Sequence, residues 1–133
     1  MKQITAILEA GKDGYGVSFK EIDNVFGFGE TIEAAKANAQ AALDTYAKAL
    51  NNYGRQLPEA LQGVYELVFE FDIEALLKYI DGVVTKTALA KAAGINVSQL
   101  SHYSSGLKRP RKEQQEKIIN GLHKIGKDLL SVS

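Results

Sequence analysis

The feature that most constrains the fold is a change of hydrophobic period near Asp72. Before it, apolar and polar residues alternate in short runs, as at residues 4–9, which is typical of strands with one buried face. After it, apolar residues recur at helical spacing, as in Ile73, Leu76, Leu77 and Ile80. We therefore expect an α+β chain of two domains, residues 1–71 and an all-α domain at residues 72–133.

The first domain is expected to have the element order β-β-β-α-β. Asp13-Gly14 is a tight-turn signal between two strand-like runs, and a third short strand is predicted over Val25–Gly29. Thr31 is the predicted N-cap of a long, alanine-rich helix, which we expect to end at residues 51–54. The last strand is predicted over Val64–Phe71, and its edge is open to pairing between chains.

The formal net charge of zero hides an asymmetry between the two halves of the chain. Through Asp72 there are 6 Lys and Arg against 11 Asp and Glu, a net charge of −5. From Ile73 onward there are 10 against 5, a net charge of +5. A basic domain favours a polyanion such as nucleic acid, because Lys and Arg release the counterions condensed on phosphates. The two halves are therefore expected to have different partners.

The composition excludes several other classes of protein. The chain has no cysteine, which excludes disulfides and thiolate metal sites, and only two histidines, so we expect no cofactor and no metal. Its longest apolar stretches are far shorter than the ~20 residues that span a bilayer, and no secretory signal is visible. We expect a cytoplasmic protein with no membrane partner.

Residues 89–106 are the most informative stretch, because their order of small, apolar and polar residues predicts two short helices joined by a tight turn. The first helix is predicted over Thr87–Ala93, with Gly94 in the turn. The second is capped by Asn96 and is expected to run to Ser105. The residues expected to pack the two helices together are Leu89, Ala90, Ile95 and Leu100, with Tyr103 beside them.

The outer side of the second helix carries side chains suited to the major groove of DNA. Gln reads adenine through two hydrogen bonds, Ser contacts several bases, and Val meets the methyl group of thymine. Flanking Lys and Arg meet phosphates, which set position without reading sequence. The predicted DNA-binding residues are Lys86, Asn96, Val97, Ser98, Gln99, His102, Ser105, Lys108 and Arg109, with Ser101 on the same side and Arg111 and Lys112 near phosphates. The alternative is a small helical bundle with a solvated polar face.

Several short motifs occur in register along this half: Leu89-Ala90, Gly94-Ile95, Leu100-Ser101, Gly106 and Lys108-Arg109-Pro110. In this order the stretch resembles the Xre/Cro-type helix-turn-helix family, over roughly Lys86 to Leu130. The resemblance implies that five residues of the second helix and its cap face DNA, namely Asn96, Val97, Ser98, Gln99 and His102. It also implies that Lys86 and Ser105 lie near phosphates. Val97 and Ser98 stand where longer polar residues are common in the family.

The acidic half carries its own motifs, Asp13-Gly14-Tyr15-Gly16-Val17-Ser18-Phe19, then the run Phe26–Ala35, then Asn38-Ala39. This aromatic hairpin, followed by a Gly-acidic-Thr entry to an alanine-rich helix, resembles the HicB family of antitoxins over residues 1–70. The resemblance implies a partial ribonuclease-H-like fold that sequesters HicA, a small mRNA-cleaving toxin. Many HicB members end in a helix-turn-helix that binds their own operator. Family members often have a proline after the aromatic strand, where this chain reads Lys20-Glu21-Ile22-Asp23-Asn24.

Together the two resemblances imply an antitoxin of a type II toxin-antitoxin system, which neutralises its toxin and represses its own operon. Its partners are expected to be a HicA-like toxin and operator double-stranded DNA, and operator binding predicts a homodimer or a higher even oligomer. The alternative is a stand-alone transcription regulator whose N-terminal domain oligomerises or senses a ligand.

A nuclease is a third, less favoured alternative. Ribonuclease-H-type catalysis needs several carboxylates on metal ions, one of them inside the first strand. The predicted first strand, Lys2–Glu9, has only Glu9, at its end. We therefore expect no enzymatic activity.

Overall fold

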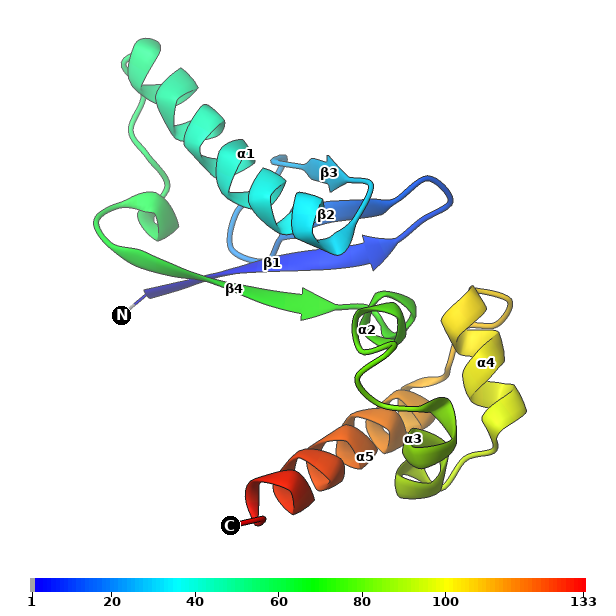
Figure 1. Cartoon of the computed structure of the whole chain (residues 1–133). Helices are drawn as coiled ribbons and strands as arrows, with labels where there is room; N and C mark the ends of the chain where they lie inside the picture. Colours follow the sequence, from blue (N-terminus) through cyan, green and yellow to red (C-terminus); the bar gives the residue numbers. More distant parts are fainter. Residues whose placement is uncertain (1) are drawn as a thin grey trace. The chain divides into compact units, whose positions relative to one another are not determined.

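The computed structural model describes residues 2–133, and the chain divides between Asp72 and Ile73 into two compact units. We call them unit 1 (residues 2–72) and unit 2 (residues 73–133). The elements of unit 1 are β1 (Lys2–Ala10), β2 (Tyr15–Phe19), β3 (Gly27–Gly29), α1 (Ile32–Asn52), the 3-10 turn η1 (Glu59–Leu61) and β4 (Tyr65–Phe71) (Figure 1). The elements of unit 2 are α2 (Ile73–Tyr79), α3 (Lys86–Ala93), α4 (Val97–Ser105) and α5 (Lys112–Leu130). The chain is therefore α+β, as expected.

The strands of unit 1 form one mixed sheet in the order β3-β2-β1-β4. β2 pairs antiparallel with both β1 and β3, whereas β4 pairs parallel with β1, from Lys2 opposite Tyr65 to Leu8 opposite Phe71. The first strand of the chain is thus an inner strand, flanked on its two sides by β2 and β4. The parallel pairing joins residues that are far apart in the sequence.

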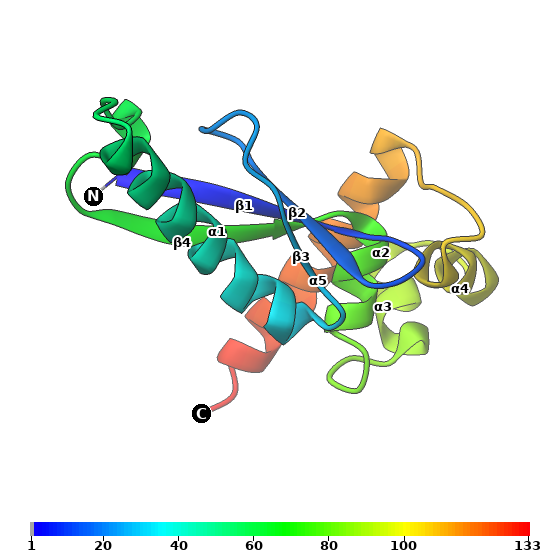
Figure 2. The same ribbon diagram turned by 90° about the horizontal axis from the view of Figure 1, so that it is seen from above.

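α1 lies over one face of this sheet in both views (Figures 1 and 2). The alternation in β1 directs Ile4, Ala6 and Leu8 to the core, and all three are fully buried. The helical residues that meet them recur at helical spacing: Ile32, Ala35, Ala39 and Leu43. Alanine at two of these positions keeps the helix axis close to the strands, because its side chain ends at Cβ.

The start of α1 is held close to β3. The Thr31 side chain caps the helix by accepting a hydrogen bond from the Ala34 N–H at 3.0 Å. A Cβ at Gly29 would overlap the backbone of Ala35, so only glycine fits there. The Phe28 N–H donates to Asn38 Oδ1 at 2.8 Å, which ties the strand to the second turn of the helix.

Unit 2 is a set of helices around a separate core. α3 packs against α5, and α2 packs against α4. Gly121 lies at the α3–α5 contact, where a Cβ would come within 2.9–3.0 Å of the backbone and Cβ of Ala93. The buried members of this core are Ile73, Leu77, Leu89, Ala90, Leu100, Tyr103 and Ile118.

Four predicted element boundaries differ from the structure. The first strand, predicted over Lys2–Glu9, ends at Ala10. The strand expected over residues 25–29 covers only residues 27–29, although Val25 is buried beside it. The last strand begins at Tyr65 rather than Val64. The helix expected to begin at Thr87 begins one residue earlier, because Thr85 is its N-cap and accepts from the Ala88 N–H at 3.1 Å. None of the helices within residues 2–133 has the length and apolar character needed to cross a membrane.

Candidate nucleic-acid interface

The candidate interface is built on α3, a three-residue turn and α4. α3 ends at Gly94, which has a left-handed backbone conformation (φ 72°) and donates its N–H to the Ala90 carbonyl at 2.9 Å. This conformation is costly for residues with a Cβ and easy for glycine. Asn96 then caps α4, since its Oδ1 accepts from the Gln99 N–H at 2.8 Å. The turn is therefore defined at both ends by local chemistry.

The core that holds the two helices is the one predicted from their apolar residues. Leu89 and Leu100 are 2% and 0% exposed, and Tyr103 is 5% exposed. Ala90 is buried between the helices, and Ile95 in the turn packs on the same cluster while remaining partly exposed. The predicted packing set is confirmed, and it leaves the opposite side of α4 to solvent.

That solvent-facing side contains the residues predicted to read DNA. Asn96, Val97, Ser98 and Ser105 are exposed, and the Val97 side chain is 41% exposed. Gln99, Ser101 and His102 are half-buried along the flank of the helix. An exposed valine beside serine and asparagine is a mixed apolar and polar surface, of the kind that contacts base edges.

Three of the nine predicted DNA-binding side chains have an intramolecular partner. Lys86 lies 3.9 Å from an Asp81 carboxylate oxygen, and the Ser105 hydroxyl donates to the His102 carbonyl at 3.2 Å. The Asn96 oxygen caps α4, which leaves its amide NH2 as the group available to a ligand. The other six have no hydrogen bond or ion pair within residues 2–133: Val97, Ser98, Gln99, His102, Lys108 and Arg109.

Basic side chains are exposed in the segment that follows α4. Lys108, Arg109, Arg111 and Lys112 are all exposed between α4 and the first turn of α5. No ion pair neutralises any of these four within the described part of the chain. Together they form an exposed basic segment, and phosphate backbones are bound by segments of this kind.

Two basic features of unit 2 were not predicted. Lys91 is exposed on the last turn of α3, one turn before the capping glycine. The polar face of α5 carries a shallow hollow lined by Asn120, His123, Lys124 and Lys127. The spacing of these four residues by three and four positions is the sequence signal that could have identified this face.

The acidic residues of unit 1 are spread over its surface. The Glu21 carboxylate accepts hydrogen bonds from the Thr5 N–H at 2.6 Å and from the Thr5 hydroxyl at 3.0 Å. Glu70 accepts from the Lys20 ammonium at 2.9 Å, and this hydrogen bond with its charge raises the pKa of Lys20 above its usual value. Within residues 2–133, no three His, Asp or Glu side chains gather as a group that could hold a metal ion.

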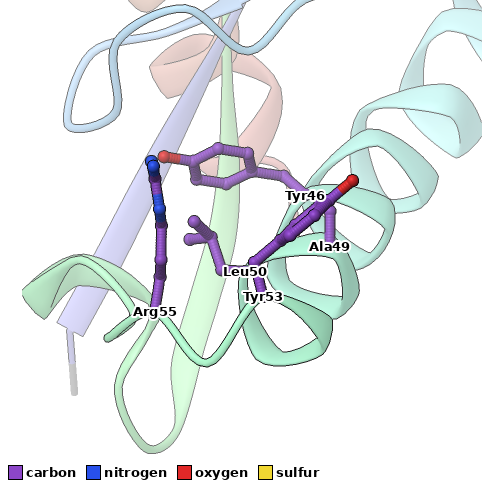
Figure 3. A pocket seen from close by; sticks show the side chains of 5 residues that line it. All are labelled: Tyr46, Ala49, Leu50, Tyr53 and Arg55. Carbon is purple, nitrogen blue, oxygen red and sulfur yellow. The ribbon is translucent and has the colours of Figure 1, made fainter.

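A hollow of about 260 Å³ lies at the C-terminal end of α1 (Figure 3). Tyr46, Ala49 and Leu50 of the helix line it, together with Tyr53 and Arg55 from the segment that follows. The Leu50 side chain points into the space between Tyr46 and Arg55 (Figure 3). The lining of the hollow is mainly apolar and aromatic, and Arg55 is its one cation.

Comparison with protein families finds no family model that matches the chain. Comparison with curated proteins finds no similar sequence.

Proposed function

We propose that this chain is a HicB-type antitoxin that neutralises a HicA-like, mRNA-cleaving toxin by direct binding and represses its own operon through unit 2. DNA and mRNA are cytoplasmic partners, so the proposal includes a cytoplasmic location. The observation that carries the proposal is the solvent-facing side of α4, whose Val97, Ser98 and Gln99 side chains have no intramolecular hydrogen bond within residues 2–133, in a unit of net charge +5.

The DNA-binding half of the proposal treats α3, the turn and α4 as a helix-turn-helix of Xre/Cro type. α4 would enter the major groove, with Val97, Ser98 and Gln99 at base edges. Lys108 and Arg109 would contact phosphates and position the helix. A buried contact between the two short helices and a glycine-containing turn support this assignment.

The toxin-binding half of the proposal treats unit 1 as a partial ribonuclease-H-like domain. It rests on the mixed sheet, with three antiparallel strands followed by a helix and a parallel fourth strand. The net charge of −5 in this half supports a basic partner. A ribonuclease has to be basic where it binds RNA, because RNA is a polyanion.

Operator binding is tested by fluorescence anisotropy with the DNA upstream of the gene and with scrambled DNA. The double variant Ser98→Ala, Gln99→Ala is expected to lower the preference for the upstream DNA about tenfold or more, because each good bidentate base contact contributes ~1–3 kcal/mol of discrimination. A matched double variant in unit 1, Thr45→Ala with Gln56→Ala, should leave the preference unchanged. An unchanged preference in the α4 variant would contradict the proposed reading helix.

The phosphate contacts are tested by salt titration. Lys108→Ala is expected to weaken binding to both DNAs and to reduce the salt slope by about one unit, as the loss of one phosphate contact does. Lys48→Ala, which removes the same charge from α1 in unit 1, is the control and should leave the slope unchanged. Equal slopes in the two variants would exclude Lys108 from the interface.

Antitoxin activity is tested with the product of the neighbouring small open reading frame. Co-expression should relieve growth arrest caused by that product, and the two proteins should co-purify. Light scattering at micromolar concentration should give a dimer or a higher even oligomer. Absence of a complex with either neighbour would refute the antitoxin proposal and leave operator binding standing.

A stand-alone, ligand-sensing regulator is the second candidate, and the hollow at the end of α1 favours it. An apolar, aromatic lining with one arginine suits a small carboxylate. Under this reading, a small aromatic carboxylate would change the operator affinity of the wild type but not of Arg55→Ala. A chain without a toxin neighbour whose affinity responds in this way would replace the antitoxin proposal.

We also propose that the chain has no nuclease activity of its own. Purified protein should leave RNA intact with Mg²⁺ or Mn²⁺ present. Metal-dependent cleavage that disappears in Glu9→Gln would overturn this part of the proposal.

A further inference from the structure

The two edges of the unit 1 sheet differ in how well they are protected. β3 forms one edge with only three residues, two of which are glycines. β4 forms the other edge with seven residues, Tyr-Glu-Leu-Val-Phe-Glu-Phe, and contains no Pro, Gly or Lys. Short strands, prolines and lysines are the usual means of preventing strand addition. The β4 edge lacks them, and no strand of residues 2–133 pairs with its outer side.

The side chains of β4 are divided between the two faces of the sheet. Tyr65, Leu67, Phe69 and Phe71 pack on the core beneath α1. The opposite face presents Glu66, half-buried Val68 and Glu70 in a row, and both glutamates are exposed. Glu70 is paired with Lys20 at 2.9 Å, whereas Glu66 has no hydrogen bond or ion pair within the described residues.

This charge pattern disfavours a second copy of the chain on the β4 edge. Antiparallel pairing of two β4 strands over all seven residues would centre on Val68. Glu66 of each strand would then lie directly opposite Glu70 of the other, twice in one interface. Like charges in directly opposed cross-strand positions are destabilising, and the Lys20–Glu70 ion pair offsets this only in part, because both of its side chains are more than half exposed.

We propose that the β4 edge binds an extended strand of a basic protein partner, with Lys or Arg at two positions four residues apart and an apolar or β-branched residue midway between them. Main-chain hydrogen bonds along β4 give the affinity, and the cations opposite Glu66 and Glu70 give the selectivity. The partner's apolar or β-branched side chain, midway between the two cations, packs over Val68. That this partner is the toxin rests on the proposed function. The open edge and its charge pattern are independent of that function.

The first test uses a synthetic probe, the peptide Val-Lys-Val-Thr-Val-Lys-Val, with the full chain. Addition of this peptide is expected to slow hydrogen exchange of β4 backbone amides and to leave β3 amides unchanged. The same peptide with Glu in place of both Lys should bind at least about tenfold more weakly, because two attractive cross-strand pairs become repulsive. The proposal would be overturned if the Lys and Glu peptides bound with equal affinity. It would also be overturned if amides outside β4 were protected, or if millimolar Lys peptide gave no protection.

Charge reversal in the protein locates the site. Glu66→Lys is expected to weaken binding of the Lys peptide about tenfold, whereas the matched control Glu33→Lys on the exposed side of α1 should not change it. Both substitutions are at exposed positions, so equal thermal midpoints verify that folding is unaffected. Protection of the β4 amides from hydrogen exchange could instead rise with protein concentration in the absence of peptide. That result would assign the edge to a second copy of the chain and refute the proposal.

Toxin binding by the same variants separates the two proposals. If the toxin binds wild type and Glu66→Lys equally and the Lys peptide does not protect β4, the edge proposal fails and the antitoxin proposal stands. If no toxin binds but the Lys peptide protects β4, the antitoxin proposal fails and the edge proposal stands.

Discussion

At the scale of single residues, Gly29 is the glycine of unit 1 at which an added Cβ would meet another atom most closely. A Cβ there would overlap the backbone N–H of Ala35, and the first turn of α1 is fixed by its own cap. Gly29→Ala is therefore expected to lower the free energy of unfolding by about 3 kcal/mol, the upper part of the usual range for overpacking. Gly16→Ala in β2 is the control, because nothing lies within 4 Å of its Cβ. Urea unfolding of both variants checks this, and equal losses would contradict it.

Asn96 has a structural and a proposed functional role that two substitutions separate. Asn96→Ala removes the cap of α4 and is expected to cost about 1 kcal/mol of stability. Asn96→Asp keeps the acceptor for the Gln99 N–H, so the stability should be preserved. The added negative charge should nevertheless weaken DNA binding, since the cap faces the polyanionic DNA in the proposed complex. Thermal unfolding and anisotropy measured on both variants distinguish the roles, and wild-type DNA affinity in Asn96→Asp would place the cap away from DNA.

Residue chemistry also explains how much of the fold could be predicted from sequence. Thr31 and Asn96 were identified as caps because each precedes an apolar helical pattern, and both accept the expected hydrogen bond. The start of α3 was predicted at Thr87, but the helix begins at Lys86, because Thr85 has an extended backbone conformation and caps it. The half-burial of Gln99 and His102 could not be predicted, since it depends on how neighbouring segments pack.

At the scale of elements, the crossing of α3 and α5 depends on one glycine. Gly121 and Gly126 both lie inside α5, and alanine is favoured over glycine in a helix by about 1 kcal/mol. Gly126→Ala should therefore stabilise the chain by about that amount, because nothing lies within 4 Å of its Cβ. Gly121→Ala should instead destabilise it by about 1–2 kcal/mol, because its Cβ would crowd Ala93 at 2.9–3.0 Å. Opposite signs in denaturant unfolding are the expected result, and stabilisation by both would mean that the helices separate easily.

The arrangement of the strands was less predictable than their existence. Alternation identified the strands, because each has one face on the core. It contained no information on which strands are neighbours, so the parallel pairing of β1 with β4 was not predicted. Nor was η1, whose three residues are too few for a periodic pattern.

At the scale of the whole molecule, the proposed operator should match a two-fold dimer. Helix-turn-helix dimers read half-sites about one helical turn apart, ~10–10.5 base pairs. Inserting about 5 base pairs between the half-sites should therefore lower the affinity to that of a single half-site. Inserting about 5 base pairs more should restore part of the lost affinity, because the half-sites return to the same side of the DNA. Footprinting with anisotropy checks this. An affinity independent of spacing would show that the chain binds DNA as independent subunits.

The inner position of β1 has a consequence for synthesis. β1 leaves the ribosome before the other elements of unit 1, yet one of its two sides is paired only after residues 65–71 have emerged. Until then, an apolar strand remains open along the side that β4 will cover, and such unpaired strands promote aggregation. Unit 2 has mainly local helical contacts, which favour rapid folding. A ribosome stalled between α1 and β4 should therefore expose a nascent chain that depends on chaperones, and release of that chain before Phe71 should give an insoluble product.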